Sequence, residues 1–266
     1  MWRMMLVISA MLGLFAWGVA RDIPLPSGRE ALGLAWSPDG RGIVVLYRGS
    51  EGGTVAWMDV ESGEARWQVA GFWLSPRSYP IAFTSNGDKV AVGTWDRVLL
   101  ISAPDGEVLA TVELEERFHP LALTFLPDGT LAVVVEEVRG VPGSLYLDTR
   151  GSAGELIERV PLGKRNTPAP RPMAAFSPDG RLLAFAAGTE GEPGGEVWLV
   201  HLLDLKAGAT RTWDLRELRP ELPWEGLRTQ IASLALRPDG GEIAVGLYSS
   251  GSDTPLVLRL DTEFDR

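Results

Sequence analysis

The chain has 266 residues, of which 45% are hydrophobic, and it carries a formal net charge of −10. The acidic balance argues against a nucleic-acid-binding protein, because neutralising phosphates needs a basic surface. The chain contains no cysteine, which excludes disulfides, so packing must supply its stability.

An apolar segment opens the sequence. Arg3 is followed by uncharged residues from Met4 to Ala20, with the small residues Gly18 and Ala20 at its end. This pattern predicts a signal peptide at residues 1–20, cleaved after Ala20, and an exported domain of residues 21–266 in the periplasm or outside the cell. The alternative is an uncleaved membrane anchor at residues 4–20, which are at the short limit for spanning a bilayer.

One turn motif recurs along the rest of the chain. Its five copies are LAWSPDG (34–40), IAFTSNG (81–87), LTFLPDG (123–129), AAFSPDG (174–180) and LALRPDG (234–240). In a type I turn, Ser suits the first position, Pro the second and Gly the fourth. A β-rich run follows each copy, so each predicts a hairpin, and the aspartates of these turns are expected to have a structural role.

Two further strand-like runs follow each of the first four hairpins. They lie at 54–60 and 64–70, 97–103 and 107–114, 144–149 and 155–162, and 196–205 and 209–215. The fifth hairpin is followed by one such run, at 255–261. Antiparallel units of four strands, repeating every 40 to 60 residues or so, are typical of β-propeller blades.

The sequence therefore predicts an all-β fold, a five-bladed β-propeller in one domain at residues 21–266. The fifth blade lacks its outer strand, and the segment RDIPLP (21–26) has no other place. We expect this mature N-terminal strand to close the ring at the edge of the fifth blade, because an edge strand tolerates its two prolines.

The turn motif and the strands around it resemble a known repeat. The sequence AAFSPDG followed by RLLAF and VWLV is similar to the WD-repeat-like propeller repeats of TolB and its relatives. The resemblance covers nearly the whole chain after residue 20 and implies the propeller fold. It does not imply a TolB role, since TolB carries a further N-terminal domain that is not found here.

The connections differ between the two faces of the predicted propeller. On one face they are short turns. On the other, which we call the long-loop face, they are long and varied, at 48–53, 136–144, 162–172, 188–196 and 216–229. Because binding residues concentrate on long loops held by a rigid scaffold, the long-loop face is the predicted binding face.

Eight residues on this face are candidate binding residues. Arginines recur where each inner strand begins, and their convergence would attract anions, while exposed tryptophans beside arginines are typical of binding hot spots. The candidates are Arg77, Tyr79, Arg117, His119, Arg171, Arg228, Trp73 and Trp224. The alternative is that the arginines are simply solvated. The tryptophans at strand positions, 36, 57, 67, 198 and 213, are expected to pack between blades.

The sequence predicts no catalytic residue, no metal site and no cofactor. The G-x-S-x-G motif of hydrolases is missing, and His119 and His201 are the only histidines, too few for a zinc site without cysteine. His201 is expected to be a satisfied or exposed strand residue, and no acidic partner is evident beside His119.

Three functions remain open at this stage. The first is a non-catalytic exported scaffold that binds an envelope or extracellular protein or a small anionic ligand. The second is an enzyme of lyase or lactonase type that uses His119 and the arginines at the channel mouth. The third is a structural envelope component anchored in the membrane by residues 4–20.

Overall fold

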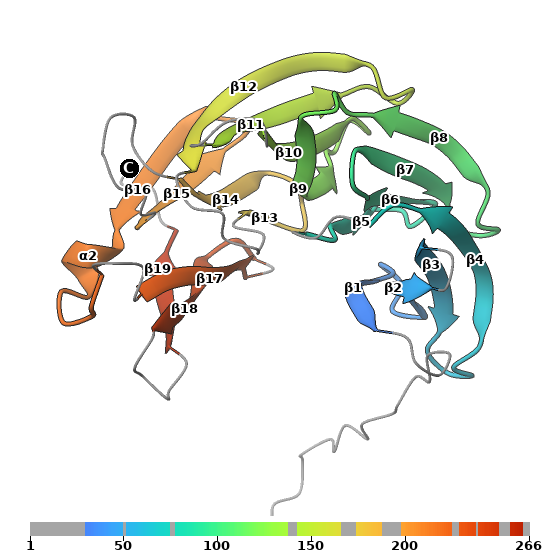
Figure 1. Cartoon of the computed structure of the whole chain (residues 1–266), viewed down its shortest axis with the longest axis horizontal. Helices are drawn as coiled ribbons and strands as arrows, with labels where there is room; N and C mark the ends of the chain where they lie inside the picture. The colour runs from blue at the N-terminus through green and yellow to red at the C-terminus, as the bar shows by residue number, and fades with distance from the viewer. Residues whose placement is uncertain are drawn as a thin grey trace, which may run out of the picture.

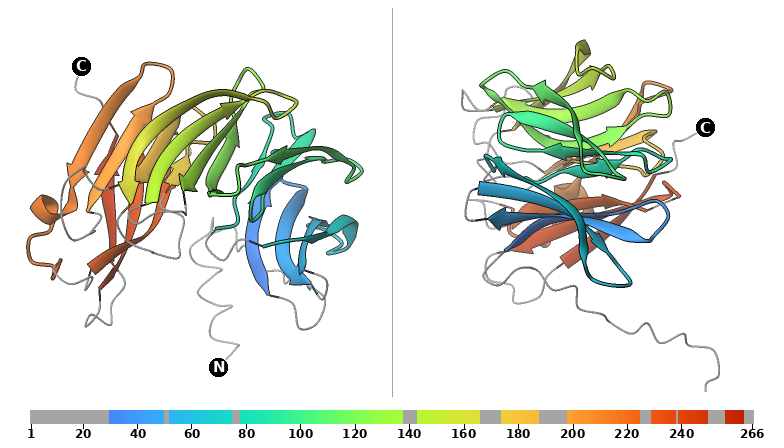
Figure 2. Two further views of the ribbon diagram at one scale, coloured as in Figure 1. Left: turned by 45° about the horizontal axis from the view of Figure 1, so that its top comes forward. Right: turned by 90° about the vertical axis from the view of Figure 1, so that its right-hand side faces the viewer.

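The computed structural model describes residues 30–49, 52–74, 78–137, 143–165, 174–187, 198–224, 229–237, 239–249 and 256–262. They form five antiparallel sheets that follow one another around an arc (Figure 1). The side views show neighbouring sheets standing face to face (Figure 2). This is the predicted all-β architecture, and the five sheets fit a five-bladed propeller.

Four of the sheets have four strands in simple order from the inside outward, as predicted. The first contains β1(Ala31–Trp36), β2(Gly42–Gly49), β3(Gly52–Asp59) and β4(Ala65–Phe72); the second contains β5(Ile81–Phe83), β6(Lys89–Gly93), β7(Arg97–Ser102) and β8(Val108–Glu113). The third contains β9(Phe118–Phe125), β10(Leu131–Glu137), β11(Gly143–Arg150) and β12(Leu156–Arg165); the fourth contains β13(Ala174–Phe176), β14(Leu182–Ala186), β15(Leu199–Asp204) and β16(Ala209–Asp214).

The fifth sheet is described with three strands, β17(Thr229–Leu236), β18(Glu242–Ser249) and β19(Leu256–Asp261). The run 255–261 is thus its third strand, as expected. The expected closing strand, residues 21–26, lies outside the described residues, as do the predicted signal peptide and anchor at residues 1–20.

The turn chemistry is local and explains why the motif repeats. Ser37 Oγ donates to Asp39 Oδ1 at 2.6 Å and accepts from the N–H of Gly42 at 2.9 Å. Gly40 has a φ of 70°, a left-handed conformation that glycine adopts without steric cost. The Ser37 hydroxyl lowers the pKa of Asp39 below its usual range. The structural role predicted for the turn aspartates is confirmed at this copy.

Hydrophobic side chains between neighbouring sheets form the core. Four clusters each join two successive sheets, because alternate residues of a strand point to opposite faces. Between the first two sheets, for example, Val44 and Leu46 pack with Val90 and Ile101. A fifth cluster, around Val45 and Tyr47, lies within the first sheet alone.

The strand tryptophans divide into two groups. Trp57, Trp67 and Trp198 are buried between sheets, as expected, and Trp213 packs against the cluster of the fourth and fifth sheets. Trp36 is 55% exposed, so the expectation that it packs between blades is wrong. It stands at the end of β1, beside the turn that begins at Ser37.

Three of the predicted long loops are shorter than expected. Strands β2 and β3 pair as far as Gly49 and Gly52, so most of the segment 48–53 is strand rather than loop. β10 reaches Glu137 and β11 begins at Gly143, while β12 extends to Arg165. The segment 216–229 includes part of a short helix, α2(Leu215–Leu218), whose N-cap is Asp214.

Candidate functional site

Two tryptophans form an exposed patch on the long-loop face. Trp73 follows β4, and Trp95 lies in the turn between β6 and β7. The backbone N–H of Trp95 donates to the carbonyl of Trp73 at 3.1 Å. Trp73 is 82% exposed and Trp95 is 39% exposed. The backbone segments that carry the two rings are therefore hydrogen-bonded to each other, although one segment follows β4 and the other joins β6 to β7.

His119 contacts both the backbone and the ring of Trp95. It lies near the start of β9, and its Nδ1 lies 2.5 Å from the carbonyl oxygen of Trp95. Because a carbonyl only accepts, the Nδ1 position carries the proton. The imidazole meets the indole edge-on, with ring centroids 4.3 Å apart. His119 is 2% exposed, so its ring supports the patch and gives a substrate no access from solvent.

Glu136 lies directly opposite His119 in the register of β9 and β10 and is 3% exposed. The sequence interpretation missed this acidic neighbour. The register itself is the signal that could have found it. Next to the turn at Asp128 and Gly129, Phe125 pairs with Leu131. The register then runs along both strands to the pair of His119 and Glu136, with one irregularity after Val134.

Arg117 directly precedes β9, and its charge is compensated. The guanidinium lies 3.4 Å from a carboxylate oxygen of Glu115 and 3.2 Å from one of Glu137. It also lies over the ring of Phe118, 5.1 Å from its centroid. The side chain remains 47% exposed. An arginine with two acidic partners contributes little to an anion-attracting rim, although its planar group can still pack against a partner.

Two further sequence candidates, Tyr79 and Trp224, are described and lie outside the patch. Tyr79 packs against the hydrophobic cluster of the first two sheets. Trp224 is only 6% exposed, and its Nε1 donates to the carbonyl of Arg219 at 2.8 Å, so the expectation of an exposed tryptophan there is wrong. Arg77, Arg171 and Arg228 lie outside the described residues.

A cavity of about 690 Å³ lies at the other end of the inner strands. Residues of β1, β5, β9 and β13 line it, together with the turns after β1, β5 and β13, and none of its lining residues is charged. Exposed Trp36 belongs to this lining. The short-turn face thus carries an exposed tryptophan of its own, in apolar surroundings and without an arginine.

Metal-ligand clusters and membrane-spanning helices are both absent from the described part of the chain. There, no group of three or more histidine or acidic side chains is placed to hold a metal ion. Within the same residues, no helix has the length and hydrophobicity needed to span a bilayer.

The sequence matches no protein-family profile and no curated protein, whereas the fold has many solved counterparts. Hydrazine synthase from Kuenenia stuttgartiensis is similar with a TM-score of 0.59 at 18% identity, over 94% of this chain and 67% of that chain. The β-propeller domain of Cps50 (Swd1) from Myceliophteria thermophila gives 0.54 at 14%, over 89% and 74%.

TolB from Acinetobacter baumannii gives a TM-score of 0.50 at 14% identity, over 89% of this chain. The present chain spans 56% of that TolB chain. These likenesses confirm, for the fold, the resemblance that the turn motif predicts.

Proposed function

We propose that this TolB-like, WD-repeat-like β-propeller is an exported scaffold without catalytic activity, and that it binds a protein partner through its long-loop face. One observation carries the proposal, the exposed pair Trp73 and Trp95. Tryptophan and arginine dominate the binding energy of protein interfaces, particularly where the side chains are already held in place. Here the backbone bond between the tryptophans and the His119 contact provide that preorganisation.

The chemistry of the patch favours a protein over a small anion. Large apolar rings offer contact area, while the only described candidate arginine, Arg117, already has Glu115 and Glu137 as partners. A complementary surface would present an apolar or aromatic pocket for Trp73, with polar groups around it. We infer that the partner is another envelope or extracellular protein.

Export is part of the proposal and is supported by the sequence of residues 1–20. Cleavage after Ala20 would leave Arg21 as the first residue in the periplasm or outside the cell. The mass of the protein recovered from the envelope fraction checks this, because an uncleaved anchor would keep residues 1–20.

The test is affinity capture from envelope extract with three forms of the purified protein. These are the unchanged protein, a Trp73→Ala/Trp95→Ala variant, and a Trp36→Ala control that removes an exposed tryptophan on the opposite face. We expect a partner on the unchanged protein and on the control, and its loss from the double variant. Each form must first show the same melting temperature and circular dichroism.

Three outcomes would contradict the proposal. Equal capture by the double variant would place the interaction elsewhere, and loss with Trp36→Ala alone would move it to the short-turn face. Capture of nothing by the unchanged protein, at concentrations that detect micromolar binding, would remove the support for a scaffold.

A further inference from the structure

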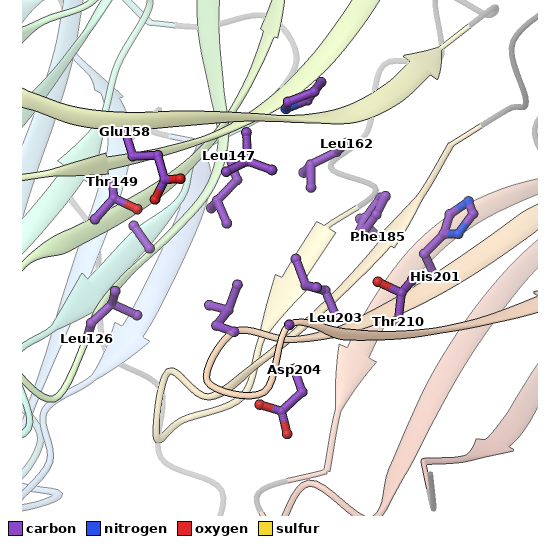
Figure 3. Close-up of a pocket in the computed structure, with 15 residues that line it drawn as sticks. Leu126, Leu147, Thr149, Glu158, Leu162, Phe185, His201, Leu203, Asp204 and Thr210 are labelled. Atoms are coloured by element: carbon purple, nitrogen blue, oxygen red, sulfur yellow. The ribbon is translucent and has the colours of Figure 1, made fainter. Parts of the chain in front are cut away.

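A groove of about 510 Å³ lies between the third and fourth sheets, away from the long-loop patch. Figure 3 shows Glu158 and Thr149 on one side of it and His201 and Thr210 on the other, with leucines between them. The leucines belong to the hydrophobic cluster of these two sheets or pack against it. A volume of this size is within the range of small-molecule sites, roughly 300–1,000 Å³.

The interface between the first two sheets shows how such a space can be filled. There Trp57 of β3 stands opposite Trp67 of β4, and both are buried. The Nε1 of Trp67 crosses the interface and donates to the carbonyl of Ala103 at 2.7 Å. The two indoles thus close the outer part of that interface.

At the positions equivalent to these two tryptophans, the third sheet has a small residue, Thr149, and a charged residue, Glu158. Trp57 lies two residues before Asp59, whose carbonyl accepts a hydrogen bond in the following turn. Thr149 lies two residues before Gly151, whose carbonyl also accepts a hydrogen bond in its own turn, which is one residue shorter. Thr149 stands opposite Glu158. The threonine and glutamate therefore occupy the positions of the two indoles, and the groove is the volume that they leave.

The histidine and the aspartate of the groove are already satisfied. His201 stacks on Phe185 with ring centroids 4.9 Å apart, and its Nδ1 lies 2.9 Å from Thr212 Oγ1. Burial lowers the pKa of His201 and so favours the neutral ring. Asp204 accepts from the guanidinium of Arg181 at 2.7 Å. Neither side chain presents an uncompensated charge to the groove.

Glu158 is different. Its side chain is exposed, and it makes no hydrogen bond or ion pair with any residue that the structure describes. It lines the groove beside leucine and valine side chains. An apolar surface with one free carboxylate, in a protein of net charge −10, is complementary to a molecule with an apolar body and one positive charge.

We propose that the groove between the third and fourth sheets is a second binding site, which takes a small amphipathic cation. The aromatic or branched aliphatic body lies on the leucines and Phe185, and the ammonium group faces Glu158. This site is independent of the protein partner proposed for the long-loop face, so either proposal can fail alone.

The test uses three probes that share one aromatic body, namely phenethylamine, 2-phenylethanol and phenylacetate. Titration calorimetry of the purified protein should give the tightest binding for the amine and the weakest for the carboxylate. Glu158→Gln should weaken the amine about two- to five-fold, the range of one exposed charge pair, and leave the alcohol unchanged. Glu158→Trp, which restores the bulk of Trp67, should abolish binding of all three.

Glu155→Gln is the matched control, since it removes one exposed negative charge on a residue that does not line the groove. Equal weakening of the amine by Glu155→Gln and Glu158→Gln would reduce the effect to net charge and overturn the proposal. Binding that survives Glu158→Trp in a folded protein, or no binding of any probe at millimolar concentration, would also overturn it.

Discussion

At the scale of single residues, the carboxylate of Asp148 forms ion pairs with two arginines inside the core. It is fully buried, and its Oδ2 lies 2.8 Å from the guanidinium of Arg150 while its Oδ1 lies 2.7 Å from that of Arg159. Arg159 extends to Glu115, 3.0 Å away, and covers the ring of Phe118 at 4.2 Å. One buried acid thus holds two arginines where the second and third sheets meet.

Replacing Asp148 by Ala should lower the free energy of unfolding by about 3–5 kcal/mol, because the buried guanidinium of Arg150 would lose its carboxylate partner. Urea unfolding followed by circular dichroism measures the change. Glu221→Ala is the control, since it breaks the exposed pair with Arg219 and should cost much less. Equal losses from the two variants would show that burial adds nothing to this contact.

At the scale of strands and turns, local chemistry predicts the turns but not the boundaries of the loops. The S-P-D-G turns could be predicted because their hydrogen bonds stay within a few residues. The ends of β2 and β3 could not, because they depend on pairing such as that of Arg48 with Gly53 across the connection. The same dependence on register hid Glu136, which is separated from His119 by a whole hairpin.

The expectation that residues 21–26 supply the outer strand of the fifth sheet leads to a prediction about stability. Deleting residues 21–27 should lower the melting temperature sharply, because β19 would then remain an edge strand with unpaired backbone groups. Differential scanning calorimetry measures the shift, with removal of residues 263–266 as the control for shortening the chain. An unchanged melting curve after the first deletion would exclude closure by this segment.

At the scale of the whole molecule, the number of sheets could be predicted because each contributes one copy of the turn. The positions that make up the two proposed binding surfaces could be predicted only in part. Trp73 and Arg117 are found from their place on the long-loop face, whereas Trp95 gains its role through the His119 contact. The groove at Glu158 depends on what two different sheets leave unfilled, and no local pattern carries that information.

Acid should destabilise every sheet, because carboxylates with lowered pKa are spread over all five. Hydrogen bonds from Ser62 and Arg66 lower the pKa of Asp59 to about 2, and Arg237 lowers that of Asp239 to about 2, from an ordinary value of 3.8. The same direction holds for Asp39, Asp88, Asp105, Asp128, Asp179 and Asp204.

Between pH 3.8 and about 2 the unfolded chain binds more protons at Asp59 and Asp239 than the folded protein does. Their contribution to stability is therefore complete above this window and is lost as the pH falls through it. Urea unfolding at pH 7, 4 and 2.5 should show the loss, and an Asp59→Asn/Asp239→Asn variant should show a shallower fall. Identical pH dependence in both proteins would contradict the assignment to these two residues.

The way the sheets pack has a consequence for how such a chain can change its length. Four hydrophobic clusters each join one sheet to the next, and every blade repeats the same order of strands. Genetic duplication of one unit would insert a sheet whose two faces meet surfaces of kinds already present, while every interface of a closed ring would adjust its angle to admit the extra blade. Descendants of this chain can therefore gain or lose whole blades more readily than they can lengthen a single strand.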